Sequence, residues 1–138
     1  MADKMALVVS EGTFDKAMMA FILGTIGASM GMEVHIFFTF FGLEILKKNA
    51  KPKLPGIYRL FGSLGVKMME KKMKKQNIGG FEESRQQAID LGAKLYACST
   101  SMSIMGVKEE DLIDGVEIVG ATKFIDLAMD AKVQLFIG

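Results

Sequence analysis

The residue best suited to chemistry is the single cysteine, Cys98. It follows a short apolar run, 94–97 (KLYA), and precedes Ser99-Thr100-Ser101, so a predicted strand gives way to a predicted helix at this point. Backbone N–H groups at such a junction can face the sulfur, and a helix N-terminus favours the thiolate, the nucleophilic form of cysteine. Position alone leaves one alternative open: Cys98 as a small, inert, buried apolar residue.

Several kinds of cysteine chemistry do not fit these 138 residues. A dithiol oxidoreductase uses Cys-x-x-Cys, and there is no second cysteine. A cysteine hydrolase needs a histidine base, and the only histidine, His35, lies inside a predicted strand, where we expect a hydrogen-bonded structural role. One Cys and one His do not make a zinc site, and no glycine-rich phosphate motif is present. What remains is sulfur chemistry between molecules, for which we expect neither metal nor cofactor.

Composition narrows the class of protein further. Half of the chain is hydrophobic and 24% is charged, which fits one globular domain and not a disordered chain. The formal net charge of +1 gives no reason to expect nucleic acid as a partner. A single cysteine excludes a disulfide scaffold, so we expect a reduced, cytoplasmic setting.

The order of apolar and periodic segments predicts an α/β domain. The charge-free run 17–32 is shorter than the roughly 20 residues of a membrane-spanning helix, so we predict a buried helix from Phe14. Five short apolar runs predict the strands of a parallel sheet: 5–10, 33–40, 94–97, 115–119 and 133–137. The predicted helices between them are 42–48, 57–75, 81–91, 99–105 and 120–129, besides the one from Phe14.

The composition changes between about residues 47 and 77. Ten basic residues and only one acidic residue, Glu70, lie between 47 and 75, together with both prolines. We interpret this stretch as a basic, Met-rich insertion or long, partly mobile connection within a single domain, 1–138. Two interpretations of its helix stay open. Either the lysines form a solvated charged face, or the helix docks to an acidic partner or to an anionic membrane surface. The candidate docking residues are Lys67, Lys71, Lys72, Lys74 and Lys75.

With these residues laid out, the chain resembles the DsrE/DsrF-like sulfur-relay family, in the branch often labelled "peroxiredoxin family protein". Four segments carry the resemblance: 7–17 (LVVSEGTFDKA), 34–43 (VHIFFTFFGL), 95–102 (LYACSTSM) and 120–122 (GAT). The resemblance implies a three-layer α/β/α fold with a five-stranded parallel sheet in the order 4-3-2-1-5, and assembly into homo-oligomers. The peroxidatic motif Pro-x-x-x-Thr-x-x-Cys is absent, so the peroxiredoxin label is not supported.

The resemblance also implies a chemistry for Cys98, because the family cysteine that carries sulfane sulfur falls on that position. The usual partners in the family are small sulfur-carrier proteins and rhodanese-like sulfurtransferases. Our leading hypothesis is therefore a sulfur-transfer or sulfur-carrier protein that holds a persulfide or thiosulfonate on Cys98. The alternative is a non-catalytic adaptor that docks through the basic segment and in which Cys98 is inert. A third hypothesis is a small-molecule or nucleotide site at the same sheet edge, without sulfur chemistry.

Ligands of open parallel sheets bind beyond the carboxyl ends of the strands, which defines the predicted pocket around Cys98. We expect the backbone N–H groups after the cysteine to stabilise the charged sulfur, and the ends of the first two strands to wall the pocket. Asp15 either orients the loop near that edge or has a purely structural role. The predicted supporting residues are Ser99, Thr100, Ser101, Ser10, Thr13, Thr39 and Phe40.

Overall fold

The computed structural model describes residues 2–138, which form a five-stranded sheet with every strand parallel. The strands occur along the sheet in the order β4-β3-β2-β1-β5. Both the predicted α/β class and the strand order implied by the family resemblance are confirmed. The strands are β1 (Lys4–Val9), β2 (Glu33–Phe38), β3 (Lys94–Cys98), β4 (Val116–Val119) and β5 (Val133–Ile137).

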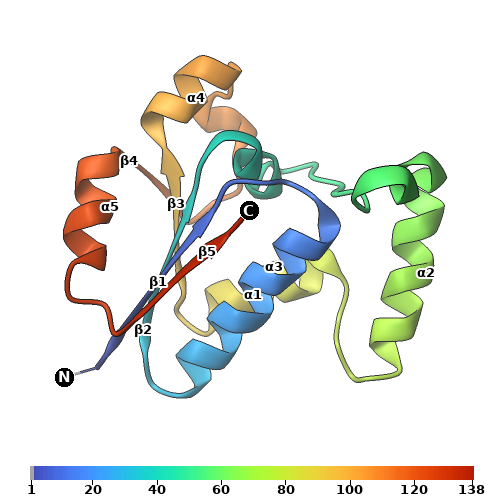
Figure 1. Ribbon diagram of the computed structural model, residues 1–138, viewed down its shortest axis with the longest axis horizontal. Coiled ribbons are helices and arrows are strands. Elements are labelled where there is room, and N and C mark those ends of the chain that lie inside the picture. The colour runs from blue at the N-terminus through green and yellow to red at the C-terminus, as the bar shows by residue number, and fades with distance from the viewer. Residues whose placement is uncertain (1) are drawn as a thin grey trace.

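Helices cover the two faces of this sheet unequally (Figure 1). Helices α1 (Phe14–Ser29) and α3 (Phe81–Asp90) lie together on one face, and α5 (Ala121–Ala128) lies on the other. Helix α4 (Ser99–Met105) follows the end of β3, and α2 (Gly62–Lys74) stands apart at one end of the molecule. Three short 3-10 helices complete the fold: η1 (Phe40–Leu46), η2 (Gly56–Phe61) and η3 (Glu109–Asp111).

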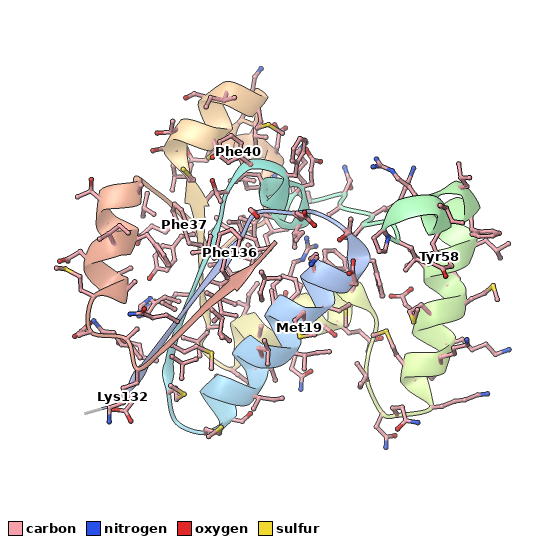
Figure 2. The ribbon with its side chains drawn as sticks, viewed as in Figure 1. Met19, Phe37, Phe40, Tyr58, Lys132 and Phe136 are labelled. Carbon is pink, nitrogen blue, oxygen red and sulfur yellow. The ribbon has the colours of Figure 1, made fainter. Side chains whose placement is uncertain are left out.

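Two apolar clusters fill the space on either side of the sheet, because successive strand residues point to opposite faces. The larger cluster lies under α1 and α3, where the ring of Phe21 is 6.1 Å from those of both Phe38 and Phe81. The smaller cluster lies under α5 and includes Phe37, which Figure 2 labels. Its ring stacks on that of Phe124 with ring centres 4.7 Å apart. Cys98 belongs to this smaller cluster.

Three predicted elements differ from the structure in kind or by two or more residues. The helix predicted over 42–48 is the 3-10 helix η1, which begins at Phe40 and ends at Leu46. The second strand was predicted to reach Phe40 but ends at Phe38, because Phe40 takes a left-handed backbone conformation (φ 49°) and begins η1. The helix predicted over 57–75 is two elements, η2 and α2, which meet at Gly62, another residue with positive φ (55°). No helix within residues 2–138 is long and apolar enough to cross a membrane.

Candidate functional site

Cys98 is the last residue of β3 and the residue that precedes the first turn of α4. Three small hydroxyl residues follow it in the helix, and Gly106, in the left-handed conformation that commonly ends helices, terminates α4. Only 6% of Cys98 is exposed in the isolated chain. The thiol therefore lies at the strand-to-helix junction expected from sequence, beneath the first turn of the helix.

A pair of hydroxyl groups lies beside this thiol. The Oγ1 atom of Thr39 and the Oγ atom of buried Ser101 are 2.7 Å apart, within hydrogen-bond distance. Thr39 is held in place because its backbone N–H donates to the carbonyl of Val9 at 3.0 Å. Strands β2 and β3 are neighbours with Phe38 opposite Ala97, so the next residue of each strand, Thr39 and Cys98, reach the same edge.

These groups change the acidity of the thiol. Burial by itself raises the pKa of Cys98, but hydrogen bonds from the Ser101 hydroxyl, the Ser101 N–H, the Thr39 hydroxyl and the Thr100 N–H together hold it below its ordinary value. Each of these donors is neutral, so the thiolate is stabilised by hydrogen bonding and not by a neighbouring cation. The site resembles the arrangements of neutral donors that stabilise negative oxygen in acyl-transfer enzymes.

The other predicted supporting residues lie around the same edge of the sheet. Ser99 is exposed in the first turn of α4. The backbone N–H of Ser10 donates to Ile137 at 3.0 Å, and its side chain lies against Gly138, beyond the ends of β1 and β5. Phe40 is exposed at the start of η1. Of the predicted set, Thr39, Thr100 and Ser101 are the residues that lower the pKa of the thiol.

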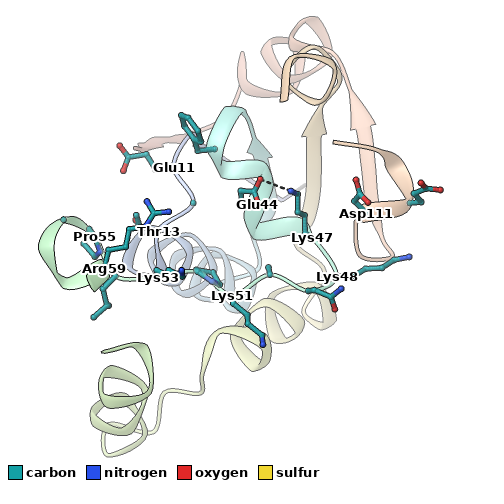
Figure 3. Close-up of a pocket in the computed structure, with 18 residues that line it drawn as sticks. Glu11, Thr13, Glu44, Lys47, Lys48, Lys51, Lys53, Pro55, Arg59 and Asp111 are labelled. Carbon is teal, nitrogen blue, oxygen red and sulfur yellow. Dashed lines mark hydrogen bonds and ion pairs between the residues drawn. The ribbon is translucent and has the colours of Figure 1, made fainter. Parts of the chain in front are cut away.

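Thr13 lies in a different place, a cavity of about 860 Å³ between the start of α1 and the segment after η1 (Figure 3). The lining includes Glu11, Lys53, Arg59 and an ion pair of 2.9 Å between Lys47 and Glu44, but not Cys98. The Oγ1 atom of Thr13 is buried, and within residues 2–138 it has no hydrogen-bond partner. The polar residues at this edge are thus divided between the thiol and a separate cavity.

Of the two ring nitrogens of His35, one has a hydrogen-bond partner among residues 2–138 and the other has none. The side chain is 3% exposed, and its Nδ1 atom is 2.7 Å from the hydroxyl of Tyr96. Burial, then Glu117 and Glu33, raise the pKa of Tyr96 to about 12, so Tyr96 remains a neutral phenol. The Nε2 atom of His35 lies 3.5 Å from the Glu33 carboxylate and makes no hydrogen bond to any described residue. In residues 2–138 no group of three or more His, Cys, Asp or Glu side chains is placed to hold a metal ion.

Two residues, Arg85 and Glu70, anchor the basic segment to the body of the protein, and the sequence analysis did not predict this role for either. Buried Arg85 donates from one guanidinium nitrogen to the carbonyls of Ile45 at 2.8 Å and Lys47 at 3.0 Å, where the segment begins. Glu70 accepts a hydrogen bond of 2.9 Å from the backbone N–H of Phe81, the first residue of α3. Its position as the one acidic residue between 47 and 75 was the available signal. The predicted docking lysines are all exposed on α2 or just after it.

Comparison with known proteins identifies the family. The model of the DsrE/DsrF/DrsH-like family matches residues 1–136. The chain belongs to this family. It is 32% identical over 155 residues to the sulfur carrier protein DsrE2 of Allochromatium vinosum, covering 97% of this chain and 98% of the relative. It is also 30% identical over 151 residues to the uncharacterized protein YrkE of Bacillus subtilis, covering 95% and 94%.

Solved structures show the same fold as this family member at low sequence identity. The ychN protein of Escherichia coli superposes with a TM-score of 0.62 at 14% identity, covering 96% of this chain and 98% of that one. The MTH1491 protein of Methanobacterium thermoautotrophicum gives 0.60 at 12% identity, covering 97% and 98%. The fold is therefore shared across sequences in which few side chains are the same.

Proposed function

We propose that this protein is a sulfur carrier that holds sulfane sulfur as a persulfide on Cys98 and passes it to a partner protein. The observation that carries the proposal is the buried thiol whose pKa is lowered by the hydroxyls of Ser101 and Thr39 and by backbone N–H groups. Similarity along the whole chain to a protein named as a sulfur carrier supports it. An activated thiol also favours this function over a non-catalytic adaptor in which Cys98 is inert.

Loading is a balanced exchange that needs no oxidant. The Cys98 thiolate attacks the outer sulfur of a donor persulfide, R–S–SH, and the S–S bond of the donor breaks. The thiolate R–S⁻ leaves with the electron pair of that bond, and the proton stays on the transferred sulfur as Cys98–S–SH. With thiosulfate as donor the same attack releases sulfite.

The hydrogen bonds around Cys98 also assist unloading, in which the sulfur passes from Cys98 to an acceptor. The thiolate of an acceptor attacks the outer sulfur of the persulfide, and the sulfur of Cys98 becomes the leaving group. A thiol of lower pKa leaves faster, so the hydrogen bonds from Ser101 and Thr39 accelerate release as well as favouring the nucleophile. The site is therefore suited to a relay in which sulfur both arrives and departs.

The partner contacts the elements that flank the thiol. Helix α4 and η1 lie against each other, and they carry the exposed apolar side chains Phe40, Phe41 and Ile104. Exposed apolar groups near a nearly covered thiol fit a second protein that binds there and gains access to the sulfur. The chemistry of the step defines this partner as a protein with its own persulfide or thiolate, such as a small sulfur-carrier protein or a rhodanese-like sulfurtransferase.

The test is intact mass spectrometry of the reduced protein after incubation with polysulfide, thiosulfate or tetrathionate. We expect an adduct of about 32 Da for a persulfide, or of about 112 Da for the thiosulfonate that forms when tetrathionate releases thiosulfate. Cys98→Ser removes the adduct and keeps the fold, and Ser103→Ala, an exposed change on the same helix, keeps the adduct. Loading of Cys98→Ser, or a wild-type protein that takes sulfur from none of these donors, contradicts the proposal.

A further inference from the structure

A row of exposed apolar side chains follows η2 and α2, and we call it the α2 stripe. Its members are Ile57, Tyr58, Leu60, Phe61, Leu64, Met68 and Met69. Leu60 is 89% exposed and Leu64 is 62% exposed, which are large fractions for leucine. Ile57, Tyr58, Leu60 and Phe61 belong to η2, and Leu64 and Met68, four residues apart, share one face of α2. Several large apolar side chains exposed on two elements that contact each other indicate a site of interaction.

Cations flank the α2 stripe, and no negative charge offsets them. Within residues 2–138 none of these cations has a carboxylate within ion-pair distance. The one acidic residue of the segment, Glu70, is engaged toward the body of the protein by the backbone N–H of Phe81. The flanking cations are Arg59, Lys67, Lys71, Lys72, Lys74 and Lys75. The outer surface of the segment is thus apolar and uniformly positive.

The position of α2 leaves this surface free. Val66 and Met73 pack against the main apolar core from the inner side of the helix, and the α2 stripe lies on other positions. Figure 1 shows α2 at the end of the molecule, with no other element beyond it. In Figure 2, Tyr58 of the stripe lies beside α2, far from the sheet. A broad flat partner can therefore contact the stripe without displacing any described part of the chain.

Length and charge decide what kind of partner fits. Helix α2 has 13 residues and is about 20 Å long, too short to span a bilayer, so it can only lie along a surface. A second copy of this chain meeting the stripe with its own stripe would bring two sets of cations together, which opposes that pairing. We propose that η2 and α2 bind the surface of an anionic lipid bilayer, with the stripe inserted at the boundary of headgroups and acyl chains. The lysine stems lie along the apolar layer, and their ammonium groups contact the lipid phosphates.

Co-sedimentation of the full chain with vesicles tests the proposal. We expect binding to vesicles of equal parts phosphatidylglycerol and phosphatidylcholine and little binding to pure phosphatidylcholine. Raising the salt concentration from about 0.05 M to about 0.5 M weakens the binding, because salt screens the lysines. Each lysine near the surface contributes about fivefold in affinity, so Lys71→Glu with Lys75→Glu weakens binding by at least about 25-fold.

Apolar insertion is tested by a matched pair of variants. Leu60→Glu with Leu64→Glu removes two side chains from the lipid and is expected to weaken vesicle binding by at least about tenfold. Ile125→Glu is the control, because Ile125 is 60% exposed on α5, outside the stripe. Circular dichroism and thermal unfolding establish that each variant is folded. Cys98→Ser is expected to bind vesicles like the wild type, which separates this proposal from sulfur carriage.

Several results would overturn the proposal. Binding to pure phosphatidylcholine as tight as to anionic vesicles would remove the role of the lysines. No vesicle binding by the wild type, together with dissociation of an oligomer by the stripe variant in sedimentation velocity, would show that a second copy covers the stripe. No vesicle binding by the wild type and an unchanged mass in solution would leave a protein partner as the occupant.

Discussion

The edge around Cys98 and the segment η2–α2 are built in opposite ways. At the edge, β-ladder contacts and the hydrogen bond from Thr39 to Val9 hold neutral donors around a thiol that is almost completely covered. The α2 segment is joined to the body by a few partly buried side chains and one hydrogen bond from Phe81 to Glu70, and its apolar side chains face solvent. Stabilising a thiolate requires donors at fixed short distances, whereas adhesion to a surface requires only exposure of the right groups.

The largest loss of stability is expected from Gly42→Ala, which tests whether close packing orders the edge around Cys98. A Cβ atom on Gly42 would collide with the carbonyl oxygen of Val9, which is backbone and cannot move aside. That same oxygen accepts the hydrogen bond of Thr39. We expect the free energy of unfolding to fall by about 3 kcal/mol or more in urea titrations.

The control for this change is Gly120→Ala beside the same site. There the nearest atom to a new Cβ is the Ser99 hydroxyl at 3.9 Å, an ordinary contact, and the backbone has a negative φ of −88°. We expect a loss below about 1 kcal/mol. Equal stability losses in the two variants would show that the close approach at Gly42 is not what orders this edge.

Arg85→Met tests the junction between the two regions. The guanidinium of Arg85 donates to the carbonyls of Ile45 and Lys47. Methionine keeps the apolar stem but removes both bonds, and the Lys47 oxygen then keeps only the N–H of Ala50 at 3.2 Å. Urea titration should show a loss of about 2–3 kcal/mol in the free energy of unfolding. Arg59→Met, at an exposed arginine with no ion pair among residues 2–138, should change it by less than about 0.5 kcal/mol.

Glu70→Gln is expected to loosen α2 while leaving the thiol unaffected. The substitution weakens a charge-assisted hydrogen bond to the N–H of Phe81 at the start of α3, worth about 1 kcal/mol. Amide hydrogen exchange over residues 62–74 should accelerate, with β3 unchanged. Sulfur loading of Cys98 should remain at the wild-type level. If loading falls along with the protection of α2, the two regions are not independent.

The smallest expected effect is a shift in the pH profile of thiol reactivity. Hydrogen bonds lower the pKa of Cys98, so at a pH below the pKa of an ordinary cysteine a larger fraction of Cys98 is thiolate. The rate of alkylation plotted against pH should therefore inflect at a lower pH than it does for a free thiol. Ser101→Ala removes the hydroxyl donor and should move the inflection to higher pH. The exposed Ser103→Ala should leave it in place. An unchanged inflection in Ser101→Ala would mean that the hydroxyl does not act on the sulfur.

The lowered pKa of Cys98 also makes the free energy of unfolding depend on pH. A thiol whose pKa is lower in the folded state than in the unfolded state stabilises the fold once the pH exceeds the unfolded value, and this contribution is lost as the pH falls through the folded value. The stability of the wild type relative to Cys98→Ser should therefore rise through that pH window. Urea titrations of both proteins across the window measure the difference.

Most of the sheet could be predicted from the sequence because buried parallel strands are apolar on both faces. The strand at 133–137 was predicted with its observed bounds, and Cys98 was correctly placed at a strand-to-helix junction. The end of β2 was predicted too late, because Phe40 and Phe41 continue an apolar run that local propensity interprets as strand. The chain turns there into η1, whose Gly42 packs against the end of β1, a contact between distant residues.

The amino-acid sequence alone was sufficient to predict the fold class, a cationic, apolar segment and a cysteine at a strand-to-helix junction as the candidate nucleophile, since residue type and spacing along the chain carry these properties. Tertiary structure decided which polar groups meet. It brought Thr39 to Ser101 and the thiol, assigned Thr13 to a separate cavity, and turned Glu70 inward so that the outer side of α2 carries no negative charge. These contacts depend on the pairing of strands and the packing of helices, which join residues far apart in the chain and are not encoded in any local pattern.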